Sequence, residues 1–232
     1  MTFTIMARCQ RTGQLGIALA TFSLAAGGYC PFVKVKVGAV SSQAFAHPTL
    51  GLRAIQLLET GSPPDDALVQ LSRSDNNFEY RQVGIVDAND GHVSVHTGRK
   101  SAPWAGHIVG EGFVAMGNML VGERVVQEMA RAFGEGLGLD LDERLLRALE
   151  AGHDAGGQQL ENRQLPERSA GLVVYADEPY ALMDLRVDMH ETAIAELRRV
   201  HATYKPYIPL YYQIRPKQPH LYIDRLNRLL KP

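Results

Sequence analysis

The stretch Thr2-Phe3-Thr4-Ile5-Met6-Ala7-Arg8 decides how the rest of the sequence is interpreted. Phe3, Ile5 and Ala7 alternate with two threonines and a methionine. This is the two-residue period of a half-buried strand, because successive side chains point to opposite faces of a sheet. If Met1 is removed, the strand begins with a threonine that carries both a hydroxyl nucleophile and an α-amine base. If Met1 is retained, the stretch predicts an ordinary strand at the start of a sheet.

The composition predicts a globular chain without a strong charge. With 232 residues and a net charge of −1, the chain can bury one large core but has no overall field to recruit nucleic acid or an anionic membrane. No apolar run approaches the ~20 residues of a membrane span, and no signal peptide is recognisable. Cys9 and Cys30 are far apart without a CxxC motif, which predicts reduced thiols in a cytoplasmic protein.

No motif predicts a metal or a cofactor. The eight histidines show neither HxH nor HExxH spacing. Gly110-Glu111-Gly112 lacks the third glycine of a dinucleotide fingerprint, and no GxxxxGK phosphate loop occurs. We therefore expect neither metal nor cofactor, no nucleic acid or membrane partner, and a small molecule as the substrate.

The hydrophobic pattern alternates between pairs of strands and pairs of helices. Expected strands lie at about residues 2–8, 15–21, 33–39, 81–87, 92–97, 112–116, 171–176 and 182–189. Expected helices lie at about 48–60, 63–71, 123–133, 140–151 and 192–204, with Gly61 and Gly152 as stop signals, and 156–168 is expected to be a surface loop. Helix pairs between hairpins suggest two stacked, mainly antiparallel sheets covered by helices, an α+β fold with four αββα layers. N-terminal-nucleophile (Ntn) hydrolases have this arrangement.

The end of the chain differs from the rest. Four of the twelve prolines fall between Pro206 and Pro219, among several tyrosines, and an amphipathic stretch follows at about 221–230. We expect one Ntn-hydrolase-like domain over residues 1–204 and a proline- and tyrosine-rich arm over 205–232. An arm with exposed aromatic residues favours a homo-oligomer.

Several short segments resemble one uncharacterised bacterial and archaeal family with an Ntn-hydrolase-like fold, domain-of-unknown-function family 1028. They are Gln43-Ala44 with Pro48 and Gly51, Arg81-Gln82-Val83-Gly84, Thr97-Gly98, Trp104-Ala105-Gly106-His107, Gly117-Asn118-Met119-Leu120, Ala151-Gly152 with Ala155-Gly156-Gly157, and Asp184-Leu185-Arg186-Val187-Asp188. The resemblance covers residues 2–199. Two departures are His47-Pro48, where the family usually has Asn-Pro, and the loop at 158–163.

The resemblance implies a nucleophile and a base at Thr2. Its hydroxyl would attack a carbonyl, and its α-amine, with an ordinary pKa near ~7.7–8.0, would relay the proton. Lys34 and Lys36, on a strand expected to pass close to the first, are candidate cations that would support the hydroxyl. The alternative for both lysines is a solvated face on an edge strand.

The remaining candidates would bind the substrate or the developing oxyanion. Gly117 and Asn118 could donate a backbone N–H and a side-chain amide, although Asn118 is an equally good N-cap for the next helix. Trp104 and His107, on either side of a turn expected at residues 105–106, could line the pocket; their alternatives are a core tryptophan and a structural histidine. Within the resembling segments, Gln43 and His47 are further candidates for substrate contacts.

The sequence favours two functions. The first is an Ntn-type amidohydrolase acting on a small amide or peptide-like molecule, with Thr2 as the nucleophile after removal of Met1. The second is a non-catalytic small-molecule-binding or scaffold protein that retains the fold.

Overall fold

The structure is a computed structural model that describes residues 1–101 and 104–230. Its strands are β1 (Thr2–Arg8), β2 (Leu15–Thr21), β3 (Pro31–Lys34), β4 (Gly38–Gln43), β5 (Gln82–Asp87), β6 (Val93–Thr97), β7 (Ala105–Gly110), β8 (Phe113–Asn118), β9 (Gln158–Leu160), β10 (Arg163–Leu165), β11 (Ser169–Tyr175) and β12 (Met183–Val187). Its helices are α1 (Pro48–Glu59), α2 (Pro64–Ser74), α3 (Arg124–Glu135), α4 (Leu141–Asp154), α5 (Ala193–Tyr204), α6 (Arg215–Lys217) and α7 (Tyr222–Leu229). The chain forms two compact units, Met1–Leu197 and Arg198–Pro232.

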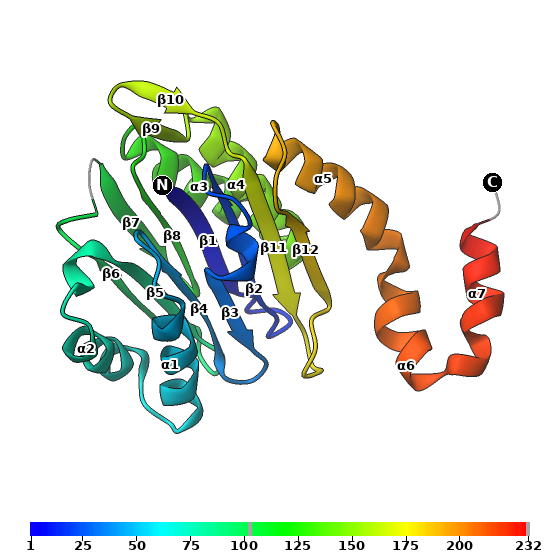
Figure 1. Cartoon of the computed structure of the whole chain (residues 1–232). Coiled ribbons are helices and arrows are strands. Elements are labelled where there is room, and N and C mark those ends of the chain that lie inside the picture. The colour runs from blue at the N-terminus through cyan, green and yellow to red at the C-terminus, as the bar shows by residue number, and fades with distance from the viewer. Residues whose placement is uncertain (102–103, 231–232) are drawn as a thin grey trace. The chain divides into compact units, whose positions relative to one another are not determined.

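The larger sheet is built around β1. Its six strands run in the order β12-β11-β2-β1-β8-β7, and every neighbouring pair is antiparallel (Figure 1). Helices α3 and α4 pack on this sheet. The contact is close because α4 places Gly152 against the sheet, where an added Cβ would lie only 3.1 Å from the ring of Phe3. Gly152 is therefore a packing residue inside α4, and the prediction that it stops the helix was wrong.

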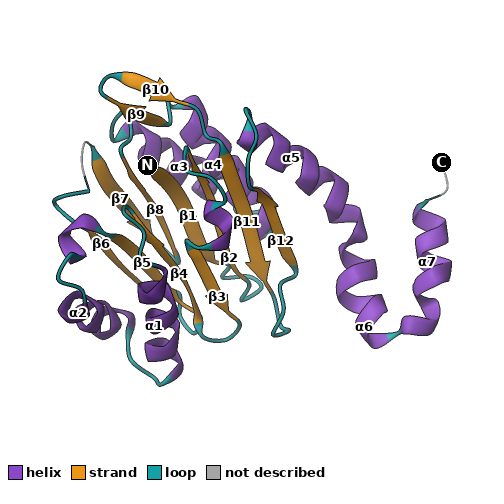
Figure 2. Cartoon of the chain, viewed as in Figure 1, coloured by secondary structure: helices purple, strands orange, loops and turns teal. Residues whose placement is uncertain are grey.

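The smaller sheet has four antiparallel strands in the order β3-β4-β5-β6. Helices α1 and α2 contact this sheet, whereas α3 and α4 contact the larger one (Figure 2). A buried apolar cluster joins the two helices to β4 and β5 through Leu50, Leu71, Val40 and Ile85. The apolar faces that the helices present with a period of 3.6 residues pack in this cluster against those that the strands present with a period of 2.

The two sheets face each other across a second apolar cluster. Met6 of β1 and Met116 of β8 pack there with Ala39 of β4 and Val86 of β5. Phe3 on β1 faces α4 while Met6 faces the smaller sheet, as the alternation of the opening stretch predicts. Mixed α and β structure with antiparallel sheets is thus confirmed.

Three predicted segments differ from the structure. Residues 33–39 were expected to form one strand, but they contain the tight turn between β3 and β4, where Lys36 has a left-handed φ of 61°. Residues 105–106 were expected to form a turn, but they begin β7. The loop expected at 156–168 contains the β9–β10 hairpin, and Gln158 in it is completely buried. In each case strand pairing decides the conformation, and the local hydrophobic pattern does not report it.

The described residues of the second unit, Arg198–Pro232, are mainly helical. The end of α5 is followed by a 3₁₀ helix, Lys205–Tyr207, a π-helix, Pro209–Ile214, and then α6 and α7. Tyr207 stacks on Tyr211 with ring centroids 5.5 Å apart, and Arg215 lies over the ring of Tyr211. The amphipathic stretch predicted near residue 221 is α7. That this arm joins copies of the chain stays a prediction. Among the residues that the structure describes, no helix has the length and apolar character needed to cross a membrane.

Candidate functional site

A small cavity lies at the start of β1. It has a volume of about 240 Å³, and its wall includes Met1, Thr2, Cys30, Phe45 and Asn118. β1 is a central strand of the larger sheet, with β2 and β8 on either side. Its first residue, Thr2, therefore lies where the strands end and loops from both sheets surround the cavity. Thr2, although only 6% exposed, therefore contributes to the cavity wall.

The bond between Met1 and Thr2 is held by two hydroxyl groups. The Thr2 hydroxyl donates to the carbonyl oxygen of Met1 at 2.5 Å. The hydroxyl of Thr21, at the end of β2, donates to the same oxygen, and the two hydroxyl oxygens are 3.4 Å apart. Two donors on one carbonyl oxygen polarise that carbonyl.

The cavity disfavours charge. Burial lowers the pKa of the Met1 α-amine to about 6, and the nearby Cys30 opposes this shift only in part. Burial also raises the pKa of the Cys30 thiol to about 12, with the α-amine acting weakly in the opposite direction. At neutral pH both groups are therefore mostly uncharged.

A buried network of neutral amides supports Thr2 from below. Gln82 accepts hydrogen bonds from Gln43 at 2.7 Å and from Asn118 at 3.1 Å. Gln43 in turn accepts from the hydroxyl of Thr4 at 2.6 Å, and Asn118 donates to the carbonyl of Thr2 at 3.4 Å. The network links both sheets beneath the nucleophile candidate, and a satisfied network of this kind is rigid.

Backbone strain gathers at the rim of the cavity. Ala44, Phe45 and Met119 all line the cavity and have left-handed φ values of 54°, 49° and 53°. Non-glycine residues adopt this conformation rarely, and it persists only where the surroundings enforce it. Such strained residues often occur at functional sites.

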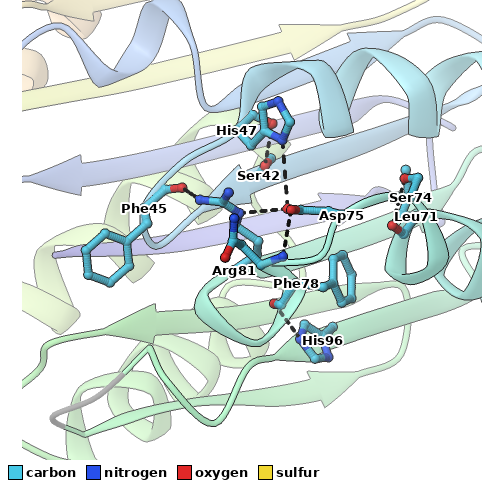
Figure 3. A network of polar contacts seen from close by, with 10 residues as sticks. Ser42, Phe45, His47, Leu71, Ser74, Asp75, Phe78, Arg81 and His96 are labelled. Atoms are coloured by element: carbon cyan, nitrogen blue, oxygen red, sulfur yellow. Dashed lines mark hydrogen bonds and ion pairs between the residues drawn. The ribbon is translucent and has the colours of Figure 1, made fainter.

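An ion pair holds this rim in place. Arg81 donates from one terminal nitrogen to the carbonyl of Phe45 and from Nε to Asp75 at 2.8 Å (Figure 3). His47 Nδ1 lies 3.8 Å from the same carboxylate, and the carbonyl of His47 accepts from Ser42. Arg81 therefore fixes the loop that places Phe45 at the cavity.

The predicted site residues fall into two groups. Thr2 and Asn118 lie together at the cavity, and Gln43 lies directly beneath them. His47 lies behind the rim, bound through Asp75. The structure does not bring the lysines there. Lys34 is at the opposite end of β3 from the cavity and pairs with Glu59, and Lys36 lies in the turn beyond it.

Gly117 and Asn118 have supporting contacts. Asn118 ends β8 and pairs with Thr2, while α3 has Glu123 as its N-cap, so the alternative that Asn118 caps this helix was wrong. The carbonyl of Gly117 accepts from Gln82 at 2.9 Å.

Trp104 and His107 lie beside the network, not on the cavity wall described above. An added Cβ at Gly106 would lie 2.8 Å from the Trp104 ring, so the glycine makes room for the indole. His107 Nδ1 is 2.9 Å from the hydroxyl of Thr97, which accepts from Gln82. Burial, and secondarily His96, lowers the pKa of His107.

Sequence reasoning missed several residues of the site. Thr21 and Cys30 belong to no motif, and Gln82 lies in the segment Arg81-Gln82-Val83-Gly84 but was given no role. The available signal was a glutamine at an inward-facing strand position, as at Gln43 and Gln82. Buried side-chain amides are almost always hydrogen-bonded, so such a glutamine predicts a buried polar network. Among the described residues, no group of three or more His, Cys, Asp or Glu side chains is arranged to hold a metal ion.

Comparisons with known proteins give the chain a family. It is similar to protein SPO2555 from Silicibacter pomeroyi, a solved structure of DUF1028, with a TM-score of 0.79 and 30% identity over 88% of each chain. Anbu (ancestral beta-subunit) from Yersinia bercovieri aligns over 89% of this chain and 96% of its own at 10% identity, but its TM-score of 0.41 supports no argument. No curated protein matches the chain. The profile of the family of unknown function DUF1028 matches residues 2–197, and the chain belongs to this family.

Proposed function

We propose that the chain is an Ntn-type amidohydrolase with αββα layers, and that it acts on a small uncharged amide. The single observation that carries the proposal is the geometry at Thr2. Its hydroxyl lies on a cavity of about 240 Å³, and a carbonyl oxygen there receives two hydroxyl hydrogen bonds. In this view Met1 occupies the place of an acyl group, and cleavage of the bond between Met1 and Thr2 frees both the cavity and the α-amine of Thr2.

The reaction follows from the groups in place. Thr2 Oγ1 attacks the substrate carbonyl carbon, and the α-amine of Thr2 takes the hydroxyl proton. The hydroxyl of Thr21, released from Met1, donates to the developing oxyanion. The carbon–nitrogen bond breaks as the α-amine returns the proton to the leaving amine. Water then hydrolyses the ester on Thr2, and Asn118 keeps the main chain of Thr2 in position throughout.

Burial, in place of a neighbouring lysine, lowers the pKa of the α-amine at this site. A base is most effective when its pKa lies near the working pH, and a neighbouring cation is one way to lower the pKa of an amine. Neither Lys34 nor Lys36 is brought to Thr2. Burial lowers the pKa of the Met1 α-amine to about 6, and we expect burial at this end of β1 to lower the pKa of the Thr2 amine in the same direction after cleavage.

The chemistry of the wall favours a neutral substrate. Its side chains are Met1, Thr2, Ser23, Tyr29, Cys30, Ala44, Phe45, Ala46, Ser101, Asn118 and Met119, none of which carries a carboxylate, ammonium or guanidinium group. A charged acyl group would lose its hydration there without a counterion. We therefore expect short neutral acyl groups to be preferred over succinyl or aminoacyl groups.

The test compares two forms of the chain, one beginning with Met1 and one released from a cleavable fusion so that Thr2 is first. Short acyl anilides, acetyl and propionyl against succinyl, report amide cleavage. We expect turnover only in the form with Thr2 first, and a loss of about 10³-fold in kcat/KM on Thr2→Ala. Thr60→Ala, an exposed threonine at the end of α1, is the matched control. Absence of turnover and of an acyl adduct on Thr2 in the freed form would rule the proposal out.

One observation favours a second function, a neutral-ligand-binding protein. The Met1 carbonyl is held by two hydroxyl groups, and the cavity wall described above contains neither lysine nor arginine to activate Thr2. For this function the native protein would retain Met1, as its intact mass would show. Amides would then bind to the Met1 form and would be cleaved by neither form.

A further inference from the structure

A second, larger cavity lies at the other end of β1. It has a volume of about 440 Å³ and collects side chains from the end of β1, the β1–β2 turn, the β7–β8 turn, the end of α3 and the start of α4. Thr2 and Arg8 are the two ends of the same strand, so the two cavities are separated by about 20 Å at ~3.3 Å per residue. The second cavity is therefore separate from the site of the proposed hydrolase and does not depend on it.

The central feature of this cavity is a buried guanidinium. Arg144 is only 7% exposed, and its guanidinium lies over the ring of Phe133, with the guanidinium carbon Cζ 3.8 Å from the ring centroid. Its Nε and Nη2 both donate to the carbonyl of Phe133, at 3.2 and 3.1 Å. Within residues 1–101 and 104–230, no carboxylate pairs with Arg144. Buried charges in proteins are usually paired, because an isolated one loses hydration without compensation.

Further arginines surround Arg144. Arg8, which is half-buried, also lines the cavity; its Nε donates to the carbonyl of Ala88 at 2.6 Å, and none of the described carboxylates pairs with it. Arg11 stands at the edge, 3.6 Å from Asp140.

The opposing charges near the cavity are few. One carboxylate in the wall, that of Glu111, is exposed, and Asp140 is already bound to Arg11. Burial raises the pKa of the Cys9 thiol, but hydrogen bonds with Thr12 and Arg11, and the charge of Arg144, lower it overall. The wall therefore carries three guanidinium groups against one carboxylate.

The rest of the wall is apolar. The rings of Phe113 and Phe133 lie 4.8 Å apart, and Leu137, 72% exposed, lies at the edge. A guanidinium binds carboxylate and phosphate oxygens through parallel N–H donors, which makes arginine the preferred residue for such anions. Aromatic and aliphatic walls beside it accept the apolar part of a ligand.

We propose that this cavity binds a small organic anion, with its carboxylate or phosphate between Arg8 and Arg144 and its apolar group against Phe113 and Leu137. The anion would supply the negative charge that no described carboxylate provides to Arg144. Binding at this end requires neither cleavage before Thr2 nor activity there.

Isothermal titration calorimetry on the full chain tests this proposal. The probes are phenyl phosphate, benzoate, inorganic phosphate and benzyl alcohol, so that charge and ring are varied separately. We expect saturable binding of phenyl phosphate or benzoate at one site per chain. Inorganic phosphate and benzyl alcohol should each bind at least about tenfold more weakly, since each lacks one half of the recognised structure.

Variants locate the site. Arg8→Gln should weaken phenyl phosphate or benzoate binding by about tenfold or more, because a charge-assisted hydrogen bond is lost. Arg144→Gln should do the same, and its circular dichroism spectrum shows whether it folds. Arg147→Gln, on the same helix but exposed and paired with Glu143 at 2.7 Å, is the matched control and should bind normally. Equal affinity in Arg8→Gln and Arg147→Gln, or no saturable binding of either organic anion, would overturn the proposal.

Discussion

The two ends of β1 differ in how they treat charge. At the Thr2 end, hydroxyl and amide groups satisfy one another, and burial keeps the α-amine and the Cys30 thiol mostly neutral. At the Arg8 end, the guanidinium of Arg144 is buried against Phe133 without a carboxylate partner among the described residues. One strand thus connects a cavity suited to neutral molecules with a cavity suited to anions. The ligand class that we propose for each cavity therefore rests on the partners of its buried groups and not on its location in the fold.

The largest effect is expected from Gln82→Leu at the neutral end. Gln82 is completely buried and is the common partner of Gln43 and Asn118. Its replacement leaves buried amides unsatisfied, which costs about 1–3 kcal/mol for each group, so we expect a loss of about 2–4 kcal/mol in the free energy of unfolding. Urea denaturation measures this loss. Gln127→Leu, on the exposed face of α3, should change stability by less than about 0.5 kcal/mol. A loss no larger in Gln82→Leu than in Gln127→Leu would show that the network does not stabilise the Thr2 end.

A pH dependence is the next largest effect. In the form that begins with Met1, the α-amine has a pKa of about 6 in the folded chain, against an ordinary value of 8.0 for an unburied α-amine, as in the unfolded chain. Between these values the unfolded chain binds a proton that the folded chain does not, so stability rises with pH from 6 to 8 and is lost as the pH falls. The expected contribution is about 1–2 kcal/mol. The thiol of Cys30, with its pKa raised from 9.0 to about 12, contributes little in this window, because it is mostly protonated in both the folded and the unfolded chain below pH 8.

Comparison of urea midpoints with those of the Nα-acetylated chain isolates this contribution, because acetylation removes the titrating group but leaves the histidines. The difference between the two chains should grow as the pH falls from 8 to 6. Parallel curves for the two chains would mean that the α-amine is solvated and that the Thr2 end is not a charge-excluding site.

The fold was predictable where local periodicity and burial agree. The alternation in residues 2–8 and the helical stripes of α1 and α4 depend only on near neighbours in sequence, and all three elements are in place. The turn at Lys36 and the strand β7 were missed because they depend on strand pairing. Valine-rich 33–37 has strand propensity but bends so that β3 can pair with β4, and glycine-containing 105–110 has low propensity but gains a partner in β8.

The candidate site was less predictable than the fold. The start of β1 could be identified because a nucleophile and its base can share one residue, Thr2. Lys34 was assigned by the expected proximity of its strand, but position along the strand matters as much, and Lys34 is at the far end of β3. Gln82 and Thr21 were not identified, because each acquires its role from partners distant in sequence.

The smallest effect should come from Arg144→Met at the charged end, and it sharpens the comparison most. Methionine keeps an unbranched apolar side chain beside Phe133 but removes the guanidinium that lies over its ring, a buried charge with no carboxylate partner among the described residues. The loss of two hydrogen bonds to the Phe133 carbonyl is therefore offset in part, and we expect a decrease of about 1 kcal/mol in the free energy of unfolding. Arg147→Met, which breaks only an exposed ion pair, should change stability by less than about 0.5 kcal/mol.

Urea denaturation with and without phenyl phosphate measures the stability of both variants and how far the ligand increases it. If Arg144 is held for an anion, the ligand should stabilise the parent chain and Arg147→Met but not Arg144→Met, because only a native-state site gains from ligand binding. A loss above about 3 kcal/mol without ligand would instead mean that the guanidinium is a structural part of the core, as after the breaking of a buried pair.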